Sequence, residues 1–589
     1  MNHNNFIFNI KHYKKIFEPL KNINLSDYKF IMDVITKGAD IKRSEIPPST
    51  SHPNYPIKDK ELIEKVTKKL LHHLELGQLR GPYDLLRHQL SFEYKIHTSP
   101  ISAKLKPSGK AIMLVDESAP KGDSINSAID PDDKCVTYTD FKQLCALLKR
   151  IGKNGWIWVI DAVDAYYRIP IHKRFHHLFG IVWLNKLLIY KCLSFGLSTA
   201  PSIYNRFADL IQWACTYWKQ NIFVNQDMLY MLHYLDDFFG GHSNRKIASK
   251  QMQFVTWLFE YLNIPTNPSK VVGPTQQADI LGWCCRTNPK VQIGLSNRKR
   301  KKYLAFILHL LKIKNVNFIQ FEKSVGYVRH TCKIYLEGIN FVRGLEKQKF
   351  ALKKQIEDSN TKTTKFTKIP LSPESIFDLE IWAQLYQSKH FQFLDIDFVL
   401  KPESLPTINI WTDASTSFGA GGLTSTHDLY HLPWSSLNIR SRTFSDRQKY
   451  EIKDHIIYLE LFAMVLMAKQ YAHKWTGKFI QFWCDNTTAV KAVKKGSIKF
   501  TADLYYPKAN LVKLLAQLAL KYKFHYDCNH IKGKKNVYAD ALSRNDKHHK
   551  KLRNKIYKMY NKKSNIPSKI ASNIINFTCV NKFCGAFNI

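Results

Sequence analysis

Tyr234-Leu235-Asp236-Asp237 is the most informative stretch of this 589-residue chain. It lies inside the segment from Met231 to Gly241, in which apolar residues flank the two adjacent acids and glycines close the run. This pattern predicts a strand, a tight turn and a second strand, with the acids at the tip of the hairpin. Burying two carboxylates among aromatic side chains costs free energy unless a cation neutralises them. The stretch therefore indicates a Mg²⁺ site, and the alternative is an acidic turn that points into water.

The composition narrows the class of protein. The length allows about three to five domains, and a hydrophobic content of 44% excludes a disordered chain. Lys and Arg number 88 and Asp and Glu number 48, so the formal net charge is +40. Such a surplus predicts a polyanionic partner, because each phosphate that a cation neutralises releases counterions. We find no uncharged apolar run that could span a bilayer and no signal peptide after Met1, so we expect no membrane partner.

The cysteines carry no sign of a special role. They are 11 in number, odd and scattered, which excludes a disulfide framework and indicates a reducing compartment inside the cell. Cys284-Cys285 and the pair Cys579 and Cys584 lack the second pair of ligands that a zinc site needs. We therefore interpret all four as free thiols.

Two further features precede the acidic hairpin. The apolar run from Trp156 to Ile160 predicts a strand buried on both faces, and Asp161 follows it where active sites of open α/β sheets tend to lie. The alternative for Asp161 is a helix or turn cap. The segment from Ser194 to Pro201 then leads into a helix that ends near Lys219, with Ser198 or Thr199 as its cap. Its glycine, Gly196, would allow a close approach to a nucleotide or base pair, unless the segment is a simple loop.

Other segments predict structure more clearly than chemistry. Lys104, Lys106 and Lys110 surround the turn Pro107-Ser108-Gly109. They could bind a triphosphate or a template backbone, and a solvated basic hairpin is equally compatible with the spacing. The patterns also predict further elements: a helix from Asp59 to Leu76, a helix from about Ile247 to Tyr261, a Lys-rich helical region from about Asn297 to Lys349, and a linker from Thr361 to Pro373.

In combination these features resemble the palm of reverse transcriptases. Asp161, the Gly196 loop, the Asp236-Asp237 hairpin, Lys270 and Leu281-Gly282-Trp283 follow one another in the order of that family. The segment from Ser118 to Asn126 resembles the variant found in DIRS-type, tyrosine-recombinase retrotransposons, and related patterns occur in pararetroviruses. The resemblance covers roughly residues 70 to 345.

The resemblance implies roles for individual residues. Asp161 and Asp236 would bind two Mg²⁺ ions, with Asp237 beside them, and Tyr166 would be a steric gate against a ribose 2′-hydroxyl. The remaining implied contacts are Asp164 and Ala165 along the triphosphate, Phe195 and Gly196 in the nucleotide pocket, Lys270 facing the leaving phosphate, and Leu281, Gly282 and Trp283 at the primer end. Many relatives carry Trp-Arg where this chain has Ala111-Ile112. The arginine contact to the triphosphate would therefore fall to Lys104, Lys106 or Lys110.

A second set of acids begins near residue 406. Asp413 ends an alternating strand from Ile408, Glu460 lies on the apolar face of a helix from Ile457 to about Trp475, and Asp485 ends a second strand. Asp540 lies in the first turn of a short helix with Asn536 as its cap. Four acids that converge would raise each other's pKa unless a divalent metal is bound. The alternative is four unrelated surface acids.

This order of Asp, Glu, Asp and Asp resembles ribonuclease H over about residues 406 to 545. The resemblance implies that Asp413, Glu460, Asp485 and Asp540 are catalytic metal ligands, with two Mg²⁺ ions per active site and Mn²⁺ as a substitute. Related enzymes often carry a histidine in a loop before the last acid. His530 lies too early and in a strand, so we interpret it as structural.

The sequence thus predicts an α+β multidomain fold: a right-hand polymerase of fingers, palm and thumb, followed by an α/β ribonuclease H-like domain. The expected parts are an N-terminal extension (1–70), fingers and palm (71–290), thumb-like helices (291–350), a connection or linker (351–405), the ribonuclease H-like domain (406–545) and a basic C-terminal tail (546–589). We expect the tail to be flexible, with nonspecific nucleic-acid binding as its most specific role.

The implied function is RNA- and DNA-directed DNA synthesis with cleavage of the RNA strand of the hybrid. Its partners would be RNA template, DNA primer, RNA–DNA hybrid and deoxynucleotides, alongside separate structural and recombinase proteins of the element. The place of action would be virus-like particles in the cytoplasm, the nucleus or both. The alternatives are a catalytically inactive nucleic-acid-binding derivative, favoured by Ile112 and the missing loop histidine, and a pararetroviral polymerase. The sequence leaves the oligomeric state open.

Overall fold

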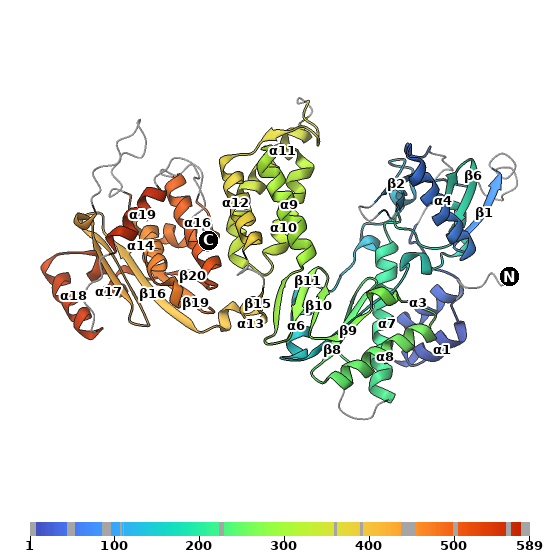
Figure 1. The fold of residues 1–589 in the computed structure, drawn as a ribbon, viewed down its shortest axis with the longest axis horizontal. Coiled ribbons are helices and arrows are strands. Elements are labelled where there is room, and N and C mark those ends of the chain that lie inside the picture. Colours follow the sequence, from blue (N-terminus) through green and yellow to red (C-terminus); the bar gives the residue numbers. More distant parts are fainter. Residues whose placement is uncertain are drawn as a thin grey trace. The chain divides into compact units, whose positions relative to one another are not determined.

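The fold is that of a computed structural model, which describes residues 8–43, 53–84, 96–105, 109, 111–222, 229–358, 362–388, 393–437, 455–498, 505–560 and 567–578 (Figure 1). Contacts divide the chain into two compact units. The first comprises Met1–Leu281 and Cys285–Val291, and the second comprises Gly282–Cys284 and Gln292–Ile589. The α+β multidomain class is confirmed. Among the described residues, no helix is both long and apolar enough to cross a bilayer.

Helices and strands alternate irregularly along the first unit. Its helices are α1 (Ile10–Phe17), α2 (Leu20–Ile23), α3 (Leu25–Thr36), α4 (Lys60–Glu75), α6 (Phe141–Ile151), α7 (Ala200–Ile222) and α8 (Arg245–Tyr261). Its strands are β1 (Leu79–Asp84), β2 (Ile101–Leu105), β3 (Ala111–Val115), β4 (Trp156–Asp161), β5 (Gly180–Trp183), β6 (Lys186–Tyr190), β7 (Met231–Tyr234), β8 (Asp237–His242), β9 (Val272–Thr275) and β10 (Gln277–Ile280). β11 (Trp283–Arg286) contains the boundary between the units.

A four-stranded sheet, in the order β7-β8-β4-β9, forms the centre of the first unit. β4 lies between β8 and β9 and runs antiparallel to both. Ile157, Trp158 and Ile160 of β4 are fully buried, as its continuous apolar run predicts. α8 packs against β8 and β9 (Figure 1). It also packs against β4, and α7 packs against β7. The hairpin β2–β3 and the sheet β1-β6-β5 complete the unit.

The N-terminal helices belong to the core of the first unit. Tyr13 and Phe17 of α1 are fully buried. The ring of Tyr13 lies 6.2 Å from that of Phe207, and the ring of Phe17 lies 6.1 Å from that of Trp213. Both partners are on α7. This packing involves residues far apart in the chain and could not be predicted from sequence periodicity.

Two predicted helices of the first unit are confirmed. α4 follows Asp59, whose side chain accepts hydrogen bonds from the amides of Glu61 and Leu62, and α8 begins two residues before its predicted start. Thr199 directly precedes α7, but neither predicted cap residue bonds the helix through its side chain. The Thr199 hydroxyl donates to the carbonyl of Ile41 instead, and the Ser198 hydroxyl has no partner among the described residues.

The second unit begins with helices and ends with an α/β domain. Its helices are α9 (Asn297–Ile313), α10 (Phe318–Thr331), α11 (Arg343–Glu357), α12 (Pro373–Gln387), α13 (Ile396–Leu400), α14 (Ile456–Tyr471), α15 (Thr487–Lys495), α16 (Tyr505–Tyr522), α17 (Val537–Ser543), α18 (Lys547–Met559) and α19 (Ser568–Thr578). Its strands are β12 (Gln292–Leu295), β13 (Asn315–Val316), β14 (Ile369–Pro370), β15 (Leu394–Asp395), β16 (Thr407–Ala414), β17 (Gly419–Thr424), β18 (Leu429–Pro433), β19 (Phe479–Cys484) and β20 (His525–His530).

A five-stranded mixed sheet organises the α/β domain. The strand order is β18-β17-β16-β19-β20. β16 is antiparallel to β17 and parallel to β19, and β19 is parallel to β20. α14 packs on β16 and β17 and on α16. Residues 458–468 of α14 are all buried, because this helix is apolar on nearly every face.

The predicted linker from Thr361 to Pro373 is wrong for residues 369–373, whereas residues 362–368 form no helix or strand. Ile369–Pro370 forms β14 and pairs with β13, and Pro373 opens α12. α12 packs against α9 and α11. Lys513 of α16 reaches Asp378 of α12 at 2.6 Å, with both side chains buried. α12, which follows this segment, is therefore part of a packed body, because a buried ion pair ties it to α16 of the α/β domain.

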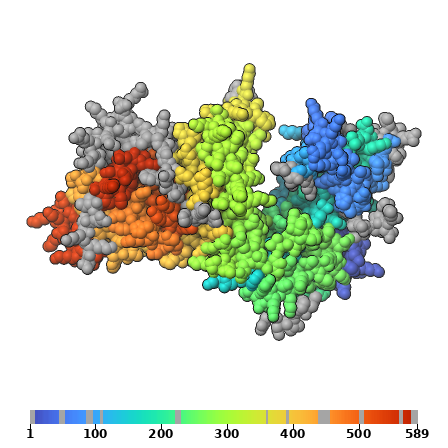
Figure 2. Space-filling model, in the orientation of Figure 1, coloured from blue at the N-terminus to red at the C-terminus, as the bar shows by residue number. Residues whose placement is uncertain are grey.

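The prediction of a flexible tail is wrong for residues 547–559 and 568–578. These residues form α18 and α19. Ile574 and Ile575 of α19 are buried against α14 and α16, and the Tyr458 hydroxyl lies 2.7 Å from the Thr578 hydroxyl. Figure 2 shows both helices, in red, against orange atoms of the α/β domain. Cys579 and Cys584 lie outside the described residues.

Candidate functional site

The acidic hairpin forms as predicted. Tyr234 pairs with Asp237, and Leu235 and Asp236 form the two-residue turn, with Leu235 at a φ of +52°. Asp161, the last residue of β4, is the register partner of Asp237. The amide of Ala162 donates to the carbonyl of Asp236 at 2.9 Å. The structure therefore brings Asp161, Asp236 and Asp237 together at one end of two neighbouring strands.

The glycines after the acids lie within β8 rather than ending the hairpin. A Cβ atom on Gly240 would lie 2.4 Å from the ring of Trp158, and one on Gly241 would lie 2.3 Å from the carbonyl oxygen of Trp156. Both distances are too short for any side chain. The glycines therefore allow β8 to pack against the two tryptophans of β4, which fixes the acids of β8 beside Asp161.

The carboxyl groups of this cluster repel one another. Burial, and then the charges of the neighbouring Asp236 and Asp161, raise the pKa of Asp237 to about 6. Burial also raises the pKa of Asp236, with a smaller contribution from Asp161. Hard cations such as Mg²⁺ prefer carboxylate oxygens as ligands. The donor set therefore fits Mg²⁺, whose charge would offset this repulsion.

Lys270 supplies the positive charge of the cluster. It ends the 3₁₀ helix η5 (Pro268–Lys270). Its Nζ donates to both carboxylate oxygens of Asp161, at 2.7 and 2.9 Å. The hydrogen bond to Asp161 raises the pKa of Lys270. The residue expected to face a leaving phosphate thus lies inside the acid cluster and neutralises part of it.

The residues expected around a nucleotide differ in exposure. Tyr166 opens the 3₁₀ helix η3 (Tyr166–Arg168), and its buried ring lies 4.9 Å from that of Phe195 and 5.7 Å from that of Tyr204. Phe195 is 57% exposed. Asp164 is exposed, whereas Ala165 is buried. The exposed side chains of Asp164 and Phe195 are therefore the ones that a ligand could reach directly.

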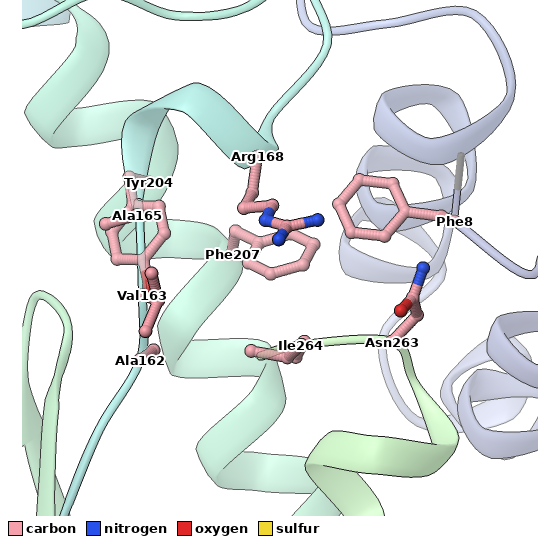
Figure 3. Close-up of a pocket in the computed structure, with 9 residues that line it drawn as sticks. All are labelled: Phe8, Ala162, Val163, Ala165, Arg168, Tyr204, Phe207, Asn263 and Ile264. Atoms are coloured by element: carbon pink, nitrogen blue, oxygen red, sulfur yellow. The ribbon is translucent and has the colours of Figure 1, made fainter. Parts of the chain in front are cut away.

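Ala165 instead lines a small cavity in the core. Phe8, Arg168, Tyr204 and Phe207 surround the same space (Figure 3). The cavity holds about 10 Å³, which is room for about one water molecule. It is too small for a nucleotide, so the predicted contact of Ala165 with the triphosphate would have to come from its backbone.

Gly196 is required by the chain itself. A Cβ atom there would lie 2.2 Å from the carbonyl oxygen of Val115 and 3.2 Å from Cγ of Glu117. The close approach that the sequence indicated is thus to the end of β3. This contact ties the loop before α7 to the base of the β2–β3 hairpin.

The lysines of the hairpin and the expected primer end are only partly described. Lys104 is exposed on β2 opposite Ile112, whereas Lys106 and Lys110 lie outside the described residues. Leu281 and Gly282 both have left-handed backbones, with φ of +52° and +82°. Within the second unit, Trp283 is 3% exposed and stacks on His330 at 4.2 Å. The indole of Trp283 thus packs in the protein interior.

The second acid set also converges. Trp411 of β16 pairs with Trp483 of β19, so Asp413 and Asp485 occupy equivalent positions two residues further along parallel strands. Oε1 of Glu460 accepts a hydrogen bond from the amide of Ala414 at 3.3 Å. One ligand atom each from Glu460, Cys484 and Asp485 lie within 4.8 Å of one another. The structure therefore brings three predicted acids together at the C-terminal ends of the inner strands β16 and β19.

Burial and mutual repulsion raise the pKa values of the acids in this second set. The pKa of Asp413 is raised to about 7 by burial and by the charge of the nearby Asp485, although a hydrogen bond from Ser543 opposes the shift. Burial and then the charges of Asp413 and Asp485 raise the pKa of Glu460 well above its ordinary value. Burial also raises the pKa of the Cys484 thiol, which leaves it protonated and unsuited to Mg²⁺. The carboxylate oxygens fit Mg²⁺ and the thiol is a neighbour.

Asp540, the fourth acid, has contacts that the sequence did not predict. Its side chain bonds Arg544, and its Oδ2 lies 2.8 Å from Nε2 of His549. His549 lies on α18, within the segment expected to be flexible, so no sequence signal pointed to it. His530 lies on β20 with its ring 3.1 Å from the backbone carbonyl of Asp485, and its structural role stays a prediction.

Asn536 is the N-cap residue of the helix that carries Asp540, as predicted, but it does not cap the helix with its side chain. Its Nδ2 donates instead to the carbonyl of Thr412 at 3.0 Å. The Ser543 hydroxyl at the other end of α17 bonds Asp413. Asn536 and Ser543 thus fix α17, and with it Asp540, against β16.

Part of the chain matches a known protein family. Residues 85–285 match the family described as "Reverse transcriptase (RNA-dependent DNA polymerase)". The chain contains a reverse transcriptase domain. This domain includes Asp161, Asp236, Asp237, Lys270 and Trp283 and supports an RNA-directed DNA polymerase. The second acid set lies outside the reverse transcriptase domain.

Solved structures give weaker likenesses. A foamy viral protease-reverse transcriptase in complex with double-stranded DNA is 14% identical, with 89% of this chain and 82% of that chain covered and a TM-score of 0.43. The foamy viral protein in complex with an RNA/DNA hybrid is 12% identical, with 91% and 86% covered and a TM-score of 0.37. No curated protein matches the chain. Likenesses this weak carry no conclusion about this chain.

Proposed function

We propose that this chain synthesises DNA on RNA and DNA templates and hydrolyses the RNA strand of the resulting hybrid. The observation that carries the proposal is the meeting of Asp161, Asp236 and Asp237 at one end of the β4–β8 pair, inside a reverse transcriptase domain. The partners would be RNA template, DNA primer, RNA–DNA hybrid and deoxynucleotides. The net charge of +40 supports polyanionic partners of this kind.

The first site would work with Mg²⁺, and Mn²⁺ would substitute for it. Two such ions, when bound, activate the primer 3′-hydroxyl and stabilise the leaving pyrophosphate. Asp161 and Asp236 would hold the ions, with Asp237 beside them. Lys270 would exchange its contacts with Asp161 for phosphate oxygens of the incoming nucleotide. The position of its Nζ, 2.7 Å from Asp161, supports this role.

The sugar and base of the nucleotide would contact an aromatic wall formed by Tyr166 and Phe195. Tyr166 would exclude a ribose 2′-hydroxyl, because its ring is held between Phe195 and Tyr204 and cannot easily move aside. Phe195 and Gly196 would line the pocket. Lys104 would contribute charge to the triphosphate from β2.

The second site would cleave the RNA strand as an endonuclease. Asp413, Glu460, Asp485 and Asp540 would hold a second pair of Mg²⁺ ions. The support is the equivalent positions of Asp413 and Asp485 on parallel strands and the contact of Glu460 with Ala414. Arg544 and His549 would orient Asp540 through their hydrogen bonds to it.

The source of the chain would be a DIRS-type retrotransposon. The support is the resemblance of the segment from Ser118 to Asn126. Separate structural and recombinase proteins would then act with the chain, in virus-like particles in the cytoplasm, in the nucleus or in both. A pararetroviral polymerase is the second candidate, and a recombinase reading frame beside the gene would favour the first.

Primer extension on an RNA template tests the first activity. Purified wild-type protein should extend a labelled DNA primer with Mg²⁺ and stop when the metal is chelated. Asp236→Asn should not extend the primer, whereas Asp279→Asn, an exposed acid on β10, should match wild type. Equal extension by wild type and Asp236→Asn would refute the assignment of the first site.

Cleavage of labelled RNA in a hybrid tests the second activity. Glu460→Gln should lose cleavage, and Glu403→Gln, an exposed acid of the same unit, should keep it. Cleavage retained by Glu460→Gln would sink the second site. Tight hybrid binding by wild type without any metal-dependent turnover would instead favour the inactive derivative.

A further inference from the structure

Glu117 is a buried acid that the proposed chemistry does not use. It follows β3 and is 2% exposed. Its Oε1 accepts a hydrogen bond from the hydroxyl of Ser194, which is itself fully buried. Its Oε2 is buried and has no hydrogen-bond partner among the described residues. A carboxylate in such a place would leave one charged oxygen without compensation.

The groups around Glu117 do not stabilise its charge. The pKa of Glu117 is raised to about 8 by burial and by the charge of Asp116, although the hydrogen bond from Ser194 opposes the shift. The other titratable groups that face it are Tyr167, Tyr190 and Cys192, whose pKa values burial raises, so all three stay neutral near pH 8. None of the groups acting on Glu117 in the described part of the chain is a cation. Glu117 is therefore a neutral acid at neutral pH.

Glu117 and its neighbours hold the loop before α7. The carbonyl of Glu117 accepts from the amide of Asn126 at 3.1 Å. The Asn126 side chain donates to the carbonyl of Gly196 and accepts from the amide of Ser198, both at 2.9 Å. The hydrogen bonds of Ser194 with Glu117 and of Gly196 with Asn126 thus fix the backbone on both sides of residue 195.

Phe195 is the residue that these contacts position. Its exposed ring lies edge-on to Tyr166 at 4.9 Å and to Tyr167 at 5.4 Å. A movement of Ser194 would displace Phe195 and release its contact with Tyr166. The wall proposed to contact the nucleotide would then lose its shape.

We propose that Glu117 is a positioning residue of the polymerase site: its neutral carboxyl, hydrogen-bonded to Ser194, holds Phe195 and Gly196 in the conformation that binds a deoxynucleotide. This inference rests on the proposed polymerase function. Ionisation of Glu117 would place an uncompensated charge in the core, so the turn that carries it would open towards water. Nucleotide binding would then weaken as pH rises, while the acids of the metal site stay ionised.

The test is the pH dependence of the KM for deoxynucleotides in primer extension. For wild type, KM should rise about tenfold between about pH 7 and about pH 9, because the competent, protonated fraction falls by that factor. Glu117→Gln keeps the shape and cannot ionise, so its KM should stay level over the same range. Ser194→Ala keeps the acid but removes its donor, so its KM should be raised at every pH. Glu64→Gln, an exposed acid on α4, should follow wild type.

The outcomes separate this inference from the function on which it rests. If wild type extends primers and Glu117→Gln shows the same alkaline rise in KM, or wild type shows none, the inference is overturned and the polymerase stands. If wild type extends no primer at any pH, both fail. A change in kcat alone, with KM level in wild type, would also overturn the inference, because a positioned pocket acts on nucleotide binding.

Discussion

The two acid clusters differ in how their charge is balanced. In the first, Lys270 bonds both oxygens of Asp161 at 2.7 and 2.9 Å. In the second, Asp413 and Glu460 are 3% and 2% exposed, and the side chains of Arg544 and His549 bond only Asp540 of the four acids. The first cluster is thus partly neutralised by its own chain. In the second cluster, the charge of the acids is neutralised by protonation or by bound metal.

This difference has a consequence for folding as well as for catalysis. Two carboxyl groups of the first cluster have raised pKa values, and that of Asp237 reaches about 6. In the second, the pKa of Asp413 reaches about 7 and that of Glu460 is raised well above its ordinary value. Metal binding should therefore stabilise the second unit more than the first, because it offsets a larger repulsion there.

The largest expected effect is the loss of polymerisation in Asp161→Asn. Extension should fall by about 10³-fold or more, the scale seen when a group that stabilises transition-state charge is removed. RNA cleavage in the hybrid should change little, because the second site has its own acids. A primer-extension assay and a cleavage assay on the same preparation measure both. If the two activities fell together in Asp161→Asn, the separation of the clusters would be wrong.

The next effect is the loss of cleavage in Asp413→Asn. The rate should fall by about 10²- to 10³-fold, with primer extension preserved. Asp397→Asn, an exposed acid at the start of α13, is the matched control. Single-turnover cleavage of labelled RNA gives the rate. If Asp413→Asn cleaved RNA at the wild-type rate, Asp413 would not belong to the second site.

A smaller effect is expected from Lys270→Met. The substitution removes two charge-assisted hydrogen bonds within the first cluster, and kcat/KM for deoxynucleotides should fall about ten- to a hundredfold. Lys246→Met, an exposed lysine on α8, should match wild type. Steady-state extension on one template measures the ratio. If Lys270→Met were as active as wild type, the balance of charge at the first cluster would not matter for the reaction.

The smallest effect concerns stability and pH. The pKa of Asp413 in the folded chain, about 7, lies above the ordinary value of 3.8. Between these values the folded state binds more protons than the unfolded state, so the free energy of unfolding falls as pH rises through this window. Without metal, each pH unit within this window should lower the Tm of wild type by ~3–5 °C more than that of Asp413→Asn, because one unit corresponds to about 1.4 kcal/mol.

Added Mg²⁺ sharpens this last prediction. At about pH 8 it should raise the Tm of wild type, and at about pH 5 it should have a smaller effect, because protonated carboxyl groups bind the ion poorly. Differential scanning fluorimetry at matched ionic strength measures both. A rise in Tm of equal size for wild type and Asp413→Asn at both pH values would contradict the proposed imbalance.

Local patterns predicted the parts of both sites that depend on neighbouring residues. The hairpin of Asp236 and Asp237 and the buried strand before Asp161 could be predicted because apolar alternation and turn residues act over a few positions. The convergence of Asp413, Glu460 and Asp485 rested on the resemblance to known enzymes. Equivalent positions on parallel strands become visible only when the strand register is known.

Contacts between distant segments could not be predicted. Asn536 has the chemistry of a helix cap, yet its amide bonds Thr412 because α17 packs on β16. His549 reaches Asp540 only because α18 folds back as a helix. No sequence pattern singled out Glu117, because its burial against Ser194 depends on residues 77 positions apart in the chain.

The most direct measurement is a single reaction on a labelled RNA template annealed to a differently labelled DNA primer, with Mg²⁺ and deoxynucleotides. One gel then reports primer extension and RNA cleavage for wild type, Asp236→Asn and Glu460→Gln. The account predicts both products for wild type, cleavage alone for Asp236→Asn and extension alone for Glu460→Gln. If either substitution removed both products, or neither removed any, the chain would not hold two independent carboxylate sites.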